Sequence, residues 1–258
     1  MRLRRAFLFA VAVLPLCGPA ARAEWPYLTE EASTLGERGW SASLGVSRTW
    51  QHSEFLRGGK GVLWTFPEVE ATLGVGPHAE VSAQYELLWF DPADDREGSY
   101  ESGDVRLWTK LSLFPETLRG FSFRFGVKLP NASDRRGLGT DETDVFLTGL
   151  WDVEAGPVLV SLNAGLGILG DPTKNGSQDD VFTWAGAARL PLAGGRFRVG
   201  VDAAGYSGPF GVHRKRDFAT YGVVLDWVLG RWRLSLGGRR GTQDALGWGW
   251  VAGVTYGR

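Results

Sequence analysis

Strict alternation of apolar and small polar residues is the feature of this chain that most limits what it can fold into. In the stretch RGWSASLGVSRTWQ (38–51), every second residue from Trp40 to Trp50 except Arg48 is apolar. The residues between them are Ser, Gly or Thr. A period of two residues places alternate side chains on opposite faces of a β-strand. The stretch therefore predicts a strand with one apolar and one small, polar face.

The same period continues along the chain, and no pattern repeats at helical spacing over a useful length. An all-β fold is therefore predicted. The alternating segments are residues 39–51, 62–75, 78–90, 103–114, 120–130, 144–153, 158–169, 181–192, 196–206, 218–228, 232–240 and 245–256.

The connections between these segments alternate in length. Short turns such as GPH (76–78) and EAGP (154–157) follow every second segment, and longer polar loops such as DPADDREGSYES (91–102) follow the others. An even strand number, with tight turns at one end and long loops at the other, is typical of outer-membrane barrels. We predict a closed antiparallel transmembrane β-barrel of about twelve strands, with short periplasmic turns and longer extracellular loops.

Charge is distributed very unequally between the two faces of the predicted strands. The apolar face is almost free of charge and carries Arg48 near the loop end of the first segment, whereas the opposite face carries acids and bases on most strands. An interior of twelve strands could not be filled by that many large apolar side chains without leaving a hole. In hydrocarbon, a closed barrel also pairs every backbone group of its strands. The apolar face is therefore predicted to contact lipid, and the charged face to line the lumen.

Aromatic residues near the segment ends predict where the membrane interfaces lie. Trp40 and Trp50 are ten positions apart, which is about 33 Å along a strand. At a tilt of about 40° this becomes about 25 Å, the height of the apolar band between aromatic girdles. The residues predicted to form the girdles are Trp40, Trp50, Trp89, Trp151, Trp227, Trp232 and Tyr256.

The first 23 residues are typical of an export signal. Three arginines within the first five residues precede an apolar run (6–16), and ARA (21–23) has the small-x-small form of a cleavage site. We predict cleavage after Ala23, which leaves no cysteine in the mature chain. The signal holds four of the 28 Lys and Arg residues and none of the 29 acids, so the formal charge becomes 24 − 29 = −5. This balance does not favour a nucleic-acid partner.

Three stretches resemble a known family. They are WPYLTEEASTLGERGW (25–40), SGDVRLWTKLSLF (102–114) and FRFGVKLPNASDRRGLGTDETDVFLTGLW (123–151). The family consists of outer-membrane β-barrel proteins with an assigned transport role in the phenol meta-cleavage pathway. The first stretch is similar to the segment that leads into the first strand of that family, and the second is similar to a strand that opens with Gly-Asp. The third is similar to a strand that ends in Lys-x-Pro and is followed by a Gly-rich loop.

The resemblance implies a location in the outer membrane of a Gram-negative bacterium. It also implies that the insertion machinery recognises the last strand, which ends at Tyr256. The chain departs from the family at LPNAS (129–133), where Pro-Thr-Gly is usual, and in having Gly257 and Arg258 after the terminal aromatic residue. No substrate is carried over from the family.

The predicted lumen charges fall into two sectors. Acids lie on the second and third segments and bases on the fourth and fifth. These candidate selectivity residues are Glu68, Glu70, Glu80, Glu86, Arg106, Lys110, Arg124 and Lys128. They could orient polar solutes in a narrow water channel, or they could pair and close the barrel. Residues 24–38, with Glu30, Glu31 and Glu37, are expected either in the periplasm or as a plug meeting the basic sector, ahead of a barrel at 39–258.

Four further motifs have ordinary interpretations. GLGILG (165–170) is followed by a loop rather than the helix that a dinucleotide site needs. DPTKNG (171–176) is predicted to be a turn, with a loop calcium site as the alternative. His52 and Ser53 have no identifiable orienting acid. HRKRD (213–217) is either a solvated charge run or a contact for lipopolysaccharide phosphates. No catalytic residue, metal or cofactor is predicted.

These observations together predict a channel for passive or facilitated passage of small solutes, with aromatic solutes as an open option. The alternatives are a closed structural or receptor-like barrel and, less favoured, a lipid-modifying enzyme. The expected partners are outer-membrane lipids and lipopolysaccharide, the insertion machinery and a small-molecule solute.

Overall fold

The computed structural model describes residues 25–53, 59–113, 120–133, 138–171, 177–207, 218–242 and 247–258. The predicted signal peptide lies outside these residues. Within them, no helix is long and apolar enough to cross a membrane.

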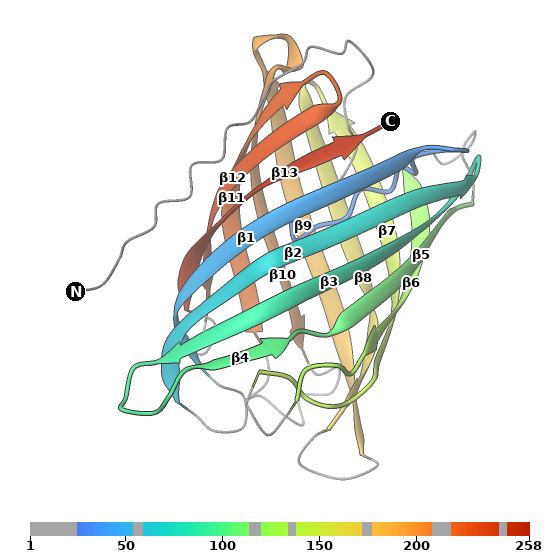
Figure 1. The fold of residues 1–258 in the computed structure, drawn as a ribbon. Helices are drawn as coiled ribbons and strands as arrows, with labels where there is room; N and C mark the ends of the chain where they lie inside the picture. Colours follow the sequence, from blue (N-terminus) through green and yellow to red (C-terminus); the bar gives the residue numbers. More distant parts are fainter. Residues whose placement is uncertain are drawn as a thin grey trace.

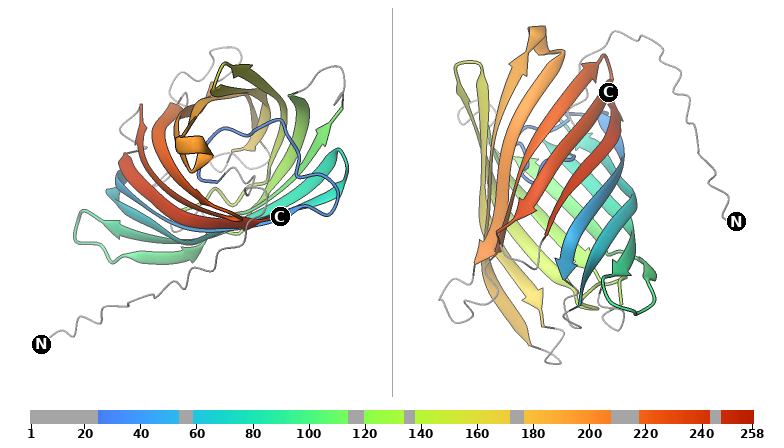
Figure 2. Two further views of the ribbon diagram at one scale, coloured as in Figure 1. Left: turned by 90° about the horizontal axis from the view of Figure 1, so that it is seen from above. Right: turned by 90° about the vertical axis from the view of Figure 1, so that its left-hand side faces the viewer.

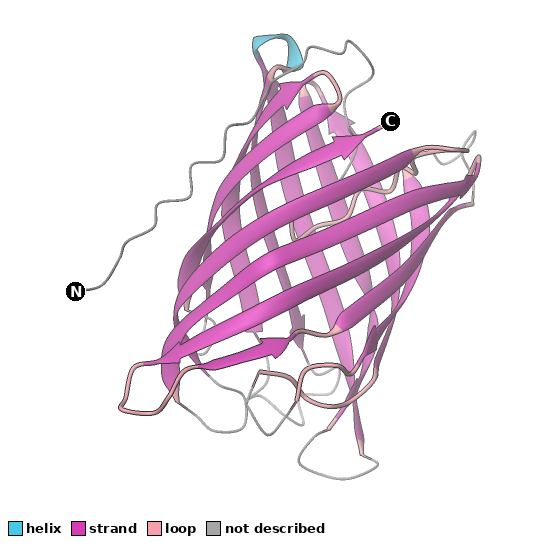
Figure 3. Ribbon diagram, viewed as in Figure 1, coloured by secondary structure: helices cyan, strands magenta, loops and turns pink. Residues whose placement is uncertain are grey.

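Nearly all of the described chain is β-strand (Figures 1 and 3). The strands are β1 (Trp40–Ser53), β2 (Lys60–Gly76), β3 (Ala79–Pro92), β4 (Ser99–Ser102), β5 (Val105–Ser112), β6 (Phe121–Leu129), β7 (Asp144–Ala155), β8 (Val158–Gly170), β9 (Gln178–Leu192), β10 (Phe197–Ser207), β11 (Phe218–Leu229), β12 (Trp232–Gly241) and β13 (Trp248–Gly257). A 3-10 turn at Ala193–Gly195 connects β9 to β10.

The sheet closes on itself as a barrel. Neighbouring strands are antiparallel throughout, and β1 pairs with both β2 and β13. The two ends of the sheet meet at Trp40 and Arg258. The Trp40 N–H donates to the Arg258 carbonyl at 3.0 Å, and the Arg258 N–H donates back to the Trp40 carbonyl at 2.8 Å. The predicted closed antiparallel barrel is confirmed.

Strands β4 and β5 share one position in the wall. Both strands pair with β3. Strand β4 pairs with its outer half (87–90), which runs to the long-loop end of the barrel, and β5 pairs with the other half (79–84), next to the short turns. The barrel therefore has twelve wall positions, as predicted. The sequence prediction had placed Ser99–Ser102 in a loop. Four residues are too few to show a period, and they become a strand because the outer half of β3 offers them free backbone partners.

Short connections gather at one end of the barrel, which the sequence analysis predicts to be the periplasmic end and which is called so below. Two-residue turns join β7 to β8 and β11 to β12, and Gly156 and Gly230 within them each have a φ of 62°. Glycine adopts this left-handed conformation without the steric cost of a Cβ.

The two faces of the barrel wall differ as the alternation predicts. Leu236 is 58% exposed on the outside, whereas Arg233, three residues before it on the same strand, is 1% exposed and points into the lumen. Large apolar side chains are exposed on every wall strand, while Lys110, Arg189 and Asp226 are buried inside. An apolar exterior around a polar lumen is the arrangement of a barrel solvated by lipid.

Candidate functional site

The N-terminal segment (Trp25–Arg38) lies inside the barrel. The left view of Figure 2, which looks into the barrel from the end with the short turns, shows the segment crossing the lumen. Between Trp25 and Leu35 its backbone forms hydrogen bonds with side chains of the wall, and near its end the Arg38 N–H donates to the Gly74 carbonyl of β2 at 3.3 Å. From Trp25 to Leu35 the hydrogen bonds of the segment reach β12, β11, β10, β9, β8, β7, β6, β5 and β3 in turn, which is the order of these strands around the barrel.

Wall carboxylates and one amide accept the backbone N–H groups of this segment. The Leu28 N–H donates to Asp202 Oδ2 at 2.6 Å, and the Ala32 N–H donates to Asp152 Oδ2 at 2.9 Å. The Leu35 N–H donates to Glu80 Oε2 at 2.7 Å. Asn163 binds Glu30 twice, with its Oδ1 accepting from the Glu30 N–H at 2.8 Å and its Nδ2 donating to the Glu30 carbonyl at 2.8 Å.

Wall cations and one hydroxyl donate to the carbonyls of the segment. Arg189 donates to the Thr29 carbonyl at 2.9 Å, and Lys110 donates to the Ser33 carbonyl at 3.1 Å. The other three pairs of donor and acceptor residues are Arg233 with Trp25, Arg239 with Pro26, and Ser122 with Ala32. Donors and acceptors of the wall thus replace the neighbouring strand that an extended backbone would otherwise need.

Glycines of the wall make room for the first side chains of the segment. Gly45 of β1 and Gly253 of β13 are register partners, and a Cβ on either would overlap the ring of Trp25. The Tyr27 hydroxyl donates to Asp226 Oδ2 at 3.0 Å. Burial, followed by the charge of Asp226, raises the pKa of Tyr27, so the phenol keeps the proton it donates.

One acid of the segment, Glu30, forms ion pairs with the predicted basic sector, and Glu31 forms ion pairs with arginines of β9 and β10. Glu30 lies between Lys110 Nζ at 3.0 Å and Arg124 Nη1 at 2.9 Å. Glu31 lies 3.4 Å from Arg189 Nη1 and 3.8 Å from Arg198 Nη1. Glu37, the third acid of the segment, is exposed.

The predicted selectivity residues lie on the inner wall. Glu80 pairs with Lys110 at 2.9 Å, and Glu86 pairs with Arg106 at 3.2 Å, so the acidic and basic sectors join where β3 meets β5. Lys128 lies 2.8 Å from Asp144 Oδ2 and 3.5 Å from Asp104 Oδ2.

The two remaining acids of the predicted set, Glu68 and Glu70, lie on β2. Glu70 accepts a hydrogen bond from the Gln84 amide at 2.5 Å. Glu68 is half-buried and is the register partner of Glu86.

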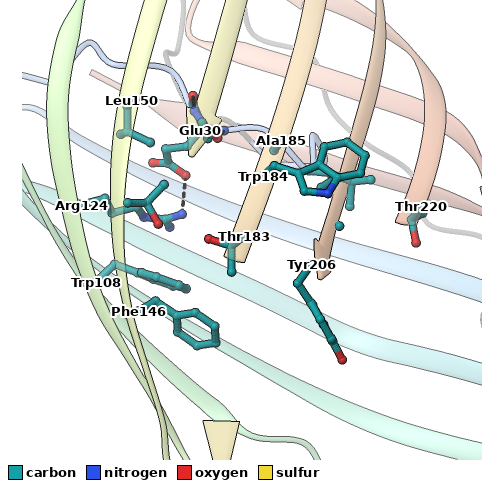
Figure 4. A pocket seen from close by; sticks show the side chains of 15 residues that line it. Glu30, Trp108, Arg124, Phe146, Leu150, Thr183, Trp184, Ala185, Tyr206 and Thr220 are labelled. Atoms are coloured by element: carbon teal, nitrogen blue, oxygen red, sulfur yellow. Dashed lines mark hydrogen bonds and ion pairs between the residues drawn. The ribbon is translucent and has the colours of Figure 1, made fainter. Parts of the chain in front are cut away.

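A chamber of about 290 Å³ lies between the N-terminal segment and the outer end of the barrel. Leu28 and Glu30 of the N-terminal segment form the side of the chamber that faces the segment, and aromatic rings line its wall (Figure 4). The Arg124 guanidinium lies 3.9 Å from the ring centre of Trp108, which in turn is 5.6 Å from that of Phe146. Hydroxyl groups of the lining come from Thr148, Thr183, Tyr206 and Thr220.

Sequence reasoning did not select the aromatic residues of this chamber. Trp108, Phe146 and Tyr206 lie on the charged parity of their strands. The sequence signal that could have identified them is an aromatic residue on the charged face of a strand, because a ring on that face points into the lumen rather than into lipid.

The predicted girdle residues lie near the strand ends, on the outer parity. Five of them are at the periplasmic end, where Tyr256 lies 5.3 Å from Trp40 and 4.5 Å from Trp232 between ring centres. Trp151 and Trp227 contact phenylalanines at the same level. Trp50 and Trp89 are at the outer end. Their role as interface anchors stays a prediction.

The remaining motifs lie partly within the described residues. The ring centre of His52 lies 6.2 Å from that of Phe90. No group of three metal-ligating side chains occurs within the described ranges. The basic run 213–217, and residues 172–176 of the calcium-like loop, lie outside them.

The closed wall, the apolar exterior and the charged lumen define the chain as a transmembrane β-barrel. No family model and no curated protein matches its sequence. The fold is similar to that of the COG4313 outer membrane channel from Pseudomonas putida F1. The TM-score is 0.63 at 13% identity, over 88% of this chain and 97% of that one.

The NanC porin is a second solved structure with a similar fold. Its TM-score is 0.53 at 11% identity, over 83% of this chain and 98% of the porin. Identities this low show a shared fold, here that of outer-membrane channels and porins. The role in phenol degradation implied by the sequence resemblance stays a prediction.

Proposed function

We propose that this protein is an outer-membrane channel for small solutes, with the N-terminal segment as its plug. The observation that carries the proposal is the chamber on the outer side of that segment. Its wall combines a cation with aromatic rings and hydroxyls, and its floor is part of the chain that is not built into the wall. Such a chamber can hold a solute while the plug blocks the way to the periplasm.

The chemistry of the chamber favours a planar solute with an anionic or strongly polar group. Trp108 and Phe146 offer ring faces, and Arg124 supplies a charge held against one of them. Arginine stacked on an aromatic ring still has in-plane N–H donors for a carboxylate or phosphate. The threonines of the chamber add neutral hydrogen-bonding groups that replace part of a solute's hydration shell.

The polar character of the plug contacts makes them reversible. Each hydrogen bond between the segment and the wall can be exchanged for bonds to water in a wet lumen, and the net cost of such an exchange is about 1.5–3 kcal/mol where the wall group is charged. A segment held by apolar packing would lose far more on leaving. An anionic solute that pairs with Arg124 would also compete with Glu30, which ties solute entry to plug release.

A closed structural barrel is the second candidate. It is favoured by the ion pairs that Lys110 makes with both Glu30 and Glu80, because they neutralise the border between the two lumen sectors.

Conductance of the refolded chain in planar bilayers tests the proposal. We expect small currents from the mature chain and several-fold larger currents when residues 25–35 are deleted. Charge reversal by Arg124→Glu with Lys128→Glu should shift the reversal potential in a salt gradient towards cation selectivity. Arg196→Glu is the matched control, since Arg196 is exposed in a periplasmic turn.

The two candidates give different results in this experiment. A folded deletion variant that passes no current would refute the channel and support the closed barrel. An equal shift of the reversal potential in Arg196→Glu would show that the lumen charges do not set selectivity.

A further inference from the structure

One arginine lies on the lipid-facing side of the barrel near its outer end. Arg48 shares the parity of Leu44 and Val46 on β1, and its register partners are Trp64 on β2 and Trp250 on β13. It is five residues from the end of the strand at Ser53. A charge on this face is costly near the centre of the bilayer and becomes affordable near the interface.

Tryptophans surround the Arg48 guanidinium without satisfying it. Its Cζ lies 4.5 Å from the ring centre of Trp50 and 4.7 Å from that of Trp64. Trp50 is itself stacked on Trp248, with 4.3 Å between ring centres. Within the described residues no carboxylate pairs with Arg48, and its Nε is buried without an acceptor. Ring faces attract the cation but leave its N–H donors available for an anion.

A second arginine lies on the same outer surface. Arg240 is exposed on β12 and is the register partner of Trp248. It has the parity of Leu234 and Leu236, which are exposed to lipid. Two strand spacings and one two-residue step separate Arg240 from Arg48, which places their Cα atoms about 12 Å apart. The stacked pair of Trp50 and Trp248 lies between the two cations.

An apolar groove begins beside Arg48. It has a volume of about 870 Å³, and its wall includes Val46, Trp64, Phe66, Trp89 and Tyr100. Val46 and Phe66 lie deeper in the membrane than Arg48, whereas Trp64 and Trp89 lie at its level in the register. The cations are thus at the interface, and the groove continues from them towards the hydrocarbon.

We propose that this outer surface binds a phosphorylated lipid of the outer leaflet, namely the lipid A part of lipopolysaccharide. Arg48 and Arg240 would each pair with a phosphate, and an acyl chain would lie in the groove against Phe66 and Trp89. Two separated cations suit a headgroup with two phosphates better than one with a single phosphate. Arginine pairs with phosphate through parallel N–H donors. This site is separate from the lumen, so it does not depend on whether the barrel conducts.

Native mass spectrometry of the refolded mature chain tests the site, with diphosphoryl lipid A as the probe. We expect a bound-lipid population that falls at least tenfold in the double variant Arg48→Gln with Arg240→Gln. Monophosphoryl lipid A should bind more weakly than the diphosphoryl form, and phosphatidylcholine more weakly still. Inorganic phosphate in excess should not displace the lipid, because it has no chain to occupy the groove.

Arg196→Gln is the control, because it removes one exposed arginine at the opposite end of the barrel. Folding of each variant is checked by the different gel migration of boiled and unboiled samples. Equal lipid A binding by the folded double variant and the unchanged protein would overturn the proposal. So would an equal loss in Arg196→Gln, or displacement by inorganic phosphate, which would indicate a site for the free ion.

Discussion

The side chain of Glu30 provides a direct way to test how the N-terminal segment is held. Its carboxylate is 17% exposed and lies between Lys110 at 3.0 Å and Arg124 at 2.9 Å. Glu30→Gln removes the charge with little change in shape. Both cations keep a second partner in this variant, since Lys110 still pairs with Glu80 and Arg124 still stacks on Trp108.

The expected magnitude follows from these contacts. Hydrogen bonds to a charged group contribute about 1.5–3 kcal/mol each. Because both cations retain a second partner, we expect the closed arrangement to lose about 2–3 kcal/mol in total rather than the sum of two bonds. At about 1.4 kcal/mol for each factor of ten, the equilibrium for release of the segment should rise roughly 30- to 150-fold.

Thiol labelling measures this release without relying on current. The predicted mature chain has no cysteine, since the single Cys17 lies in the signal peptide. Ala32 is 1% exposed, and both its N–H and its carbonyl are bonded to the wall. Ala32→Cys should therefore react with a water-soluble maleimide only when the segment leaves. With opening in fast equilibrium, the labelling rate should rise by the factor given above when Glu30→Gln is added.

Glu37→Gln is the control for this measurement. Glu37 belongs to the same segment and carries the same charge, but its side chain is exposed. A labelling rate in Glu30→Gln that stays within threefold of the rate in Glu37→Gln would refute the idea that the two ion pairs hold the segment in place.

Two further changes test the packing of the segment and the orientation of the wall. Gly45→Val should expel Trp25, whose ring occupies the space of the new side chain, and raise the Ala32→Cys labelling rate at least tenfold; Gly238→Val, with open space at its Cβ, should not. Leu236→Arg should lower the free energy of unfolding in phospholipid vesicles by about 2–4 kcal/mol, because Leu236 is exposed to lipid near the middle of β12. An unchanged urea midpoint would contradict this orientation.

The alternation of residue types carries the architecture in its own right. Where apolar and polar residues alternate, as from Trp40 to Trp50, each side chain is assigned to a face by local geometry alone. With nearly all charges on one face, a membrane-spanning chain has few solutions other than a closed barrel. The twelve wall positions, the short turns and the lipid-facing side could therefore be predicted before any contact was known.

Local pattern says much less about the contents of the lumen. Residues 25–38 show no period of two, so their sequence left a periplasmic tail and a plug equally open. Their place depends on side chains such as Asp202, Asn163 and Lys110, which come from separate strands and meet only after closure.

The same distinction applies to the charges and rings of the inner wall. The sequence by itself determined that Glu80 and Lys110 face inward, and the register between β3 and β5 decided that they pair. Trp108, Phe146 and Tyr206 line one chamber because closure brings β5, β7 and β10 around the same space. Periodicity is a property of neighbours along the chain, whereas a chamber depends on distances across the barrel, and only the tertiary structure determines those.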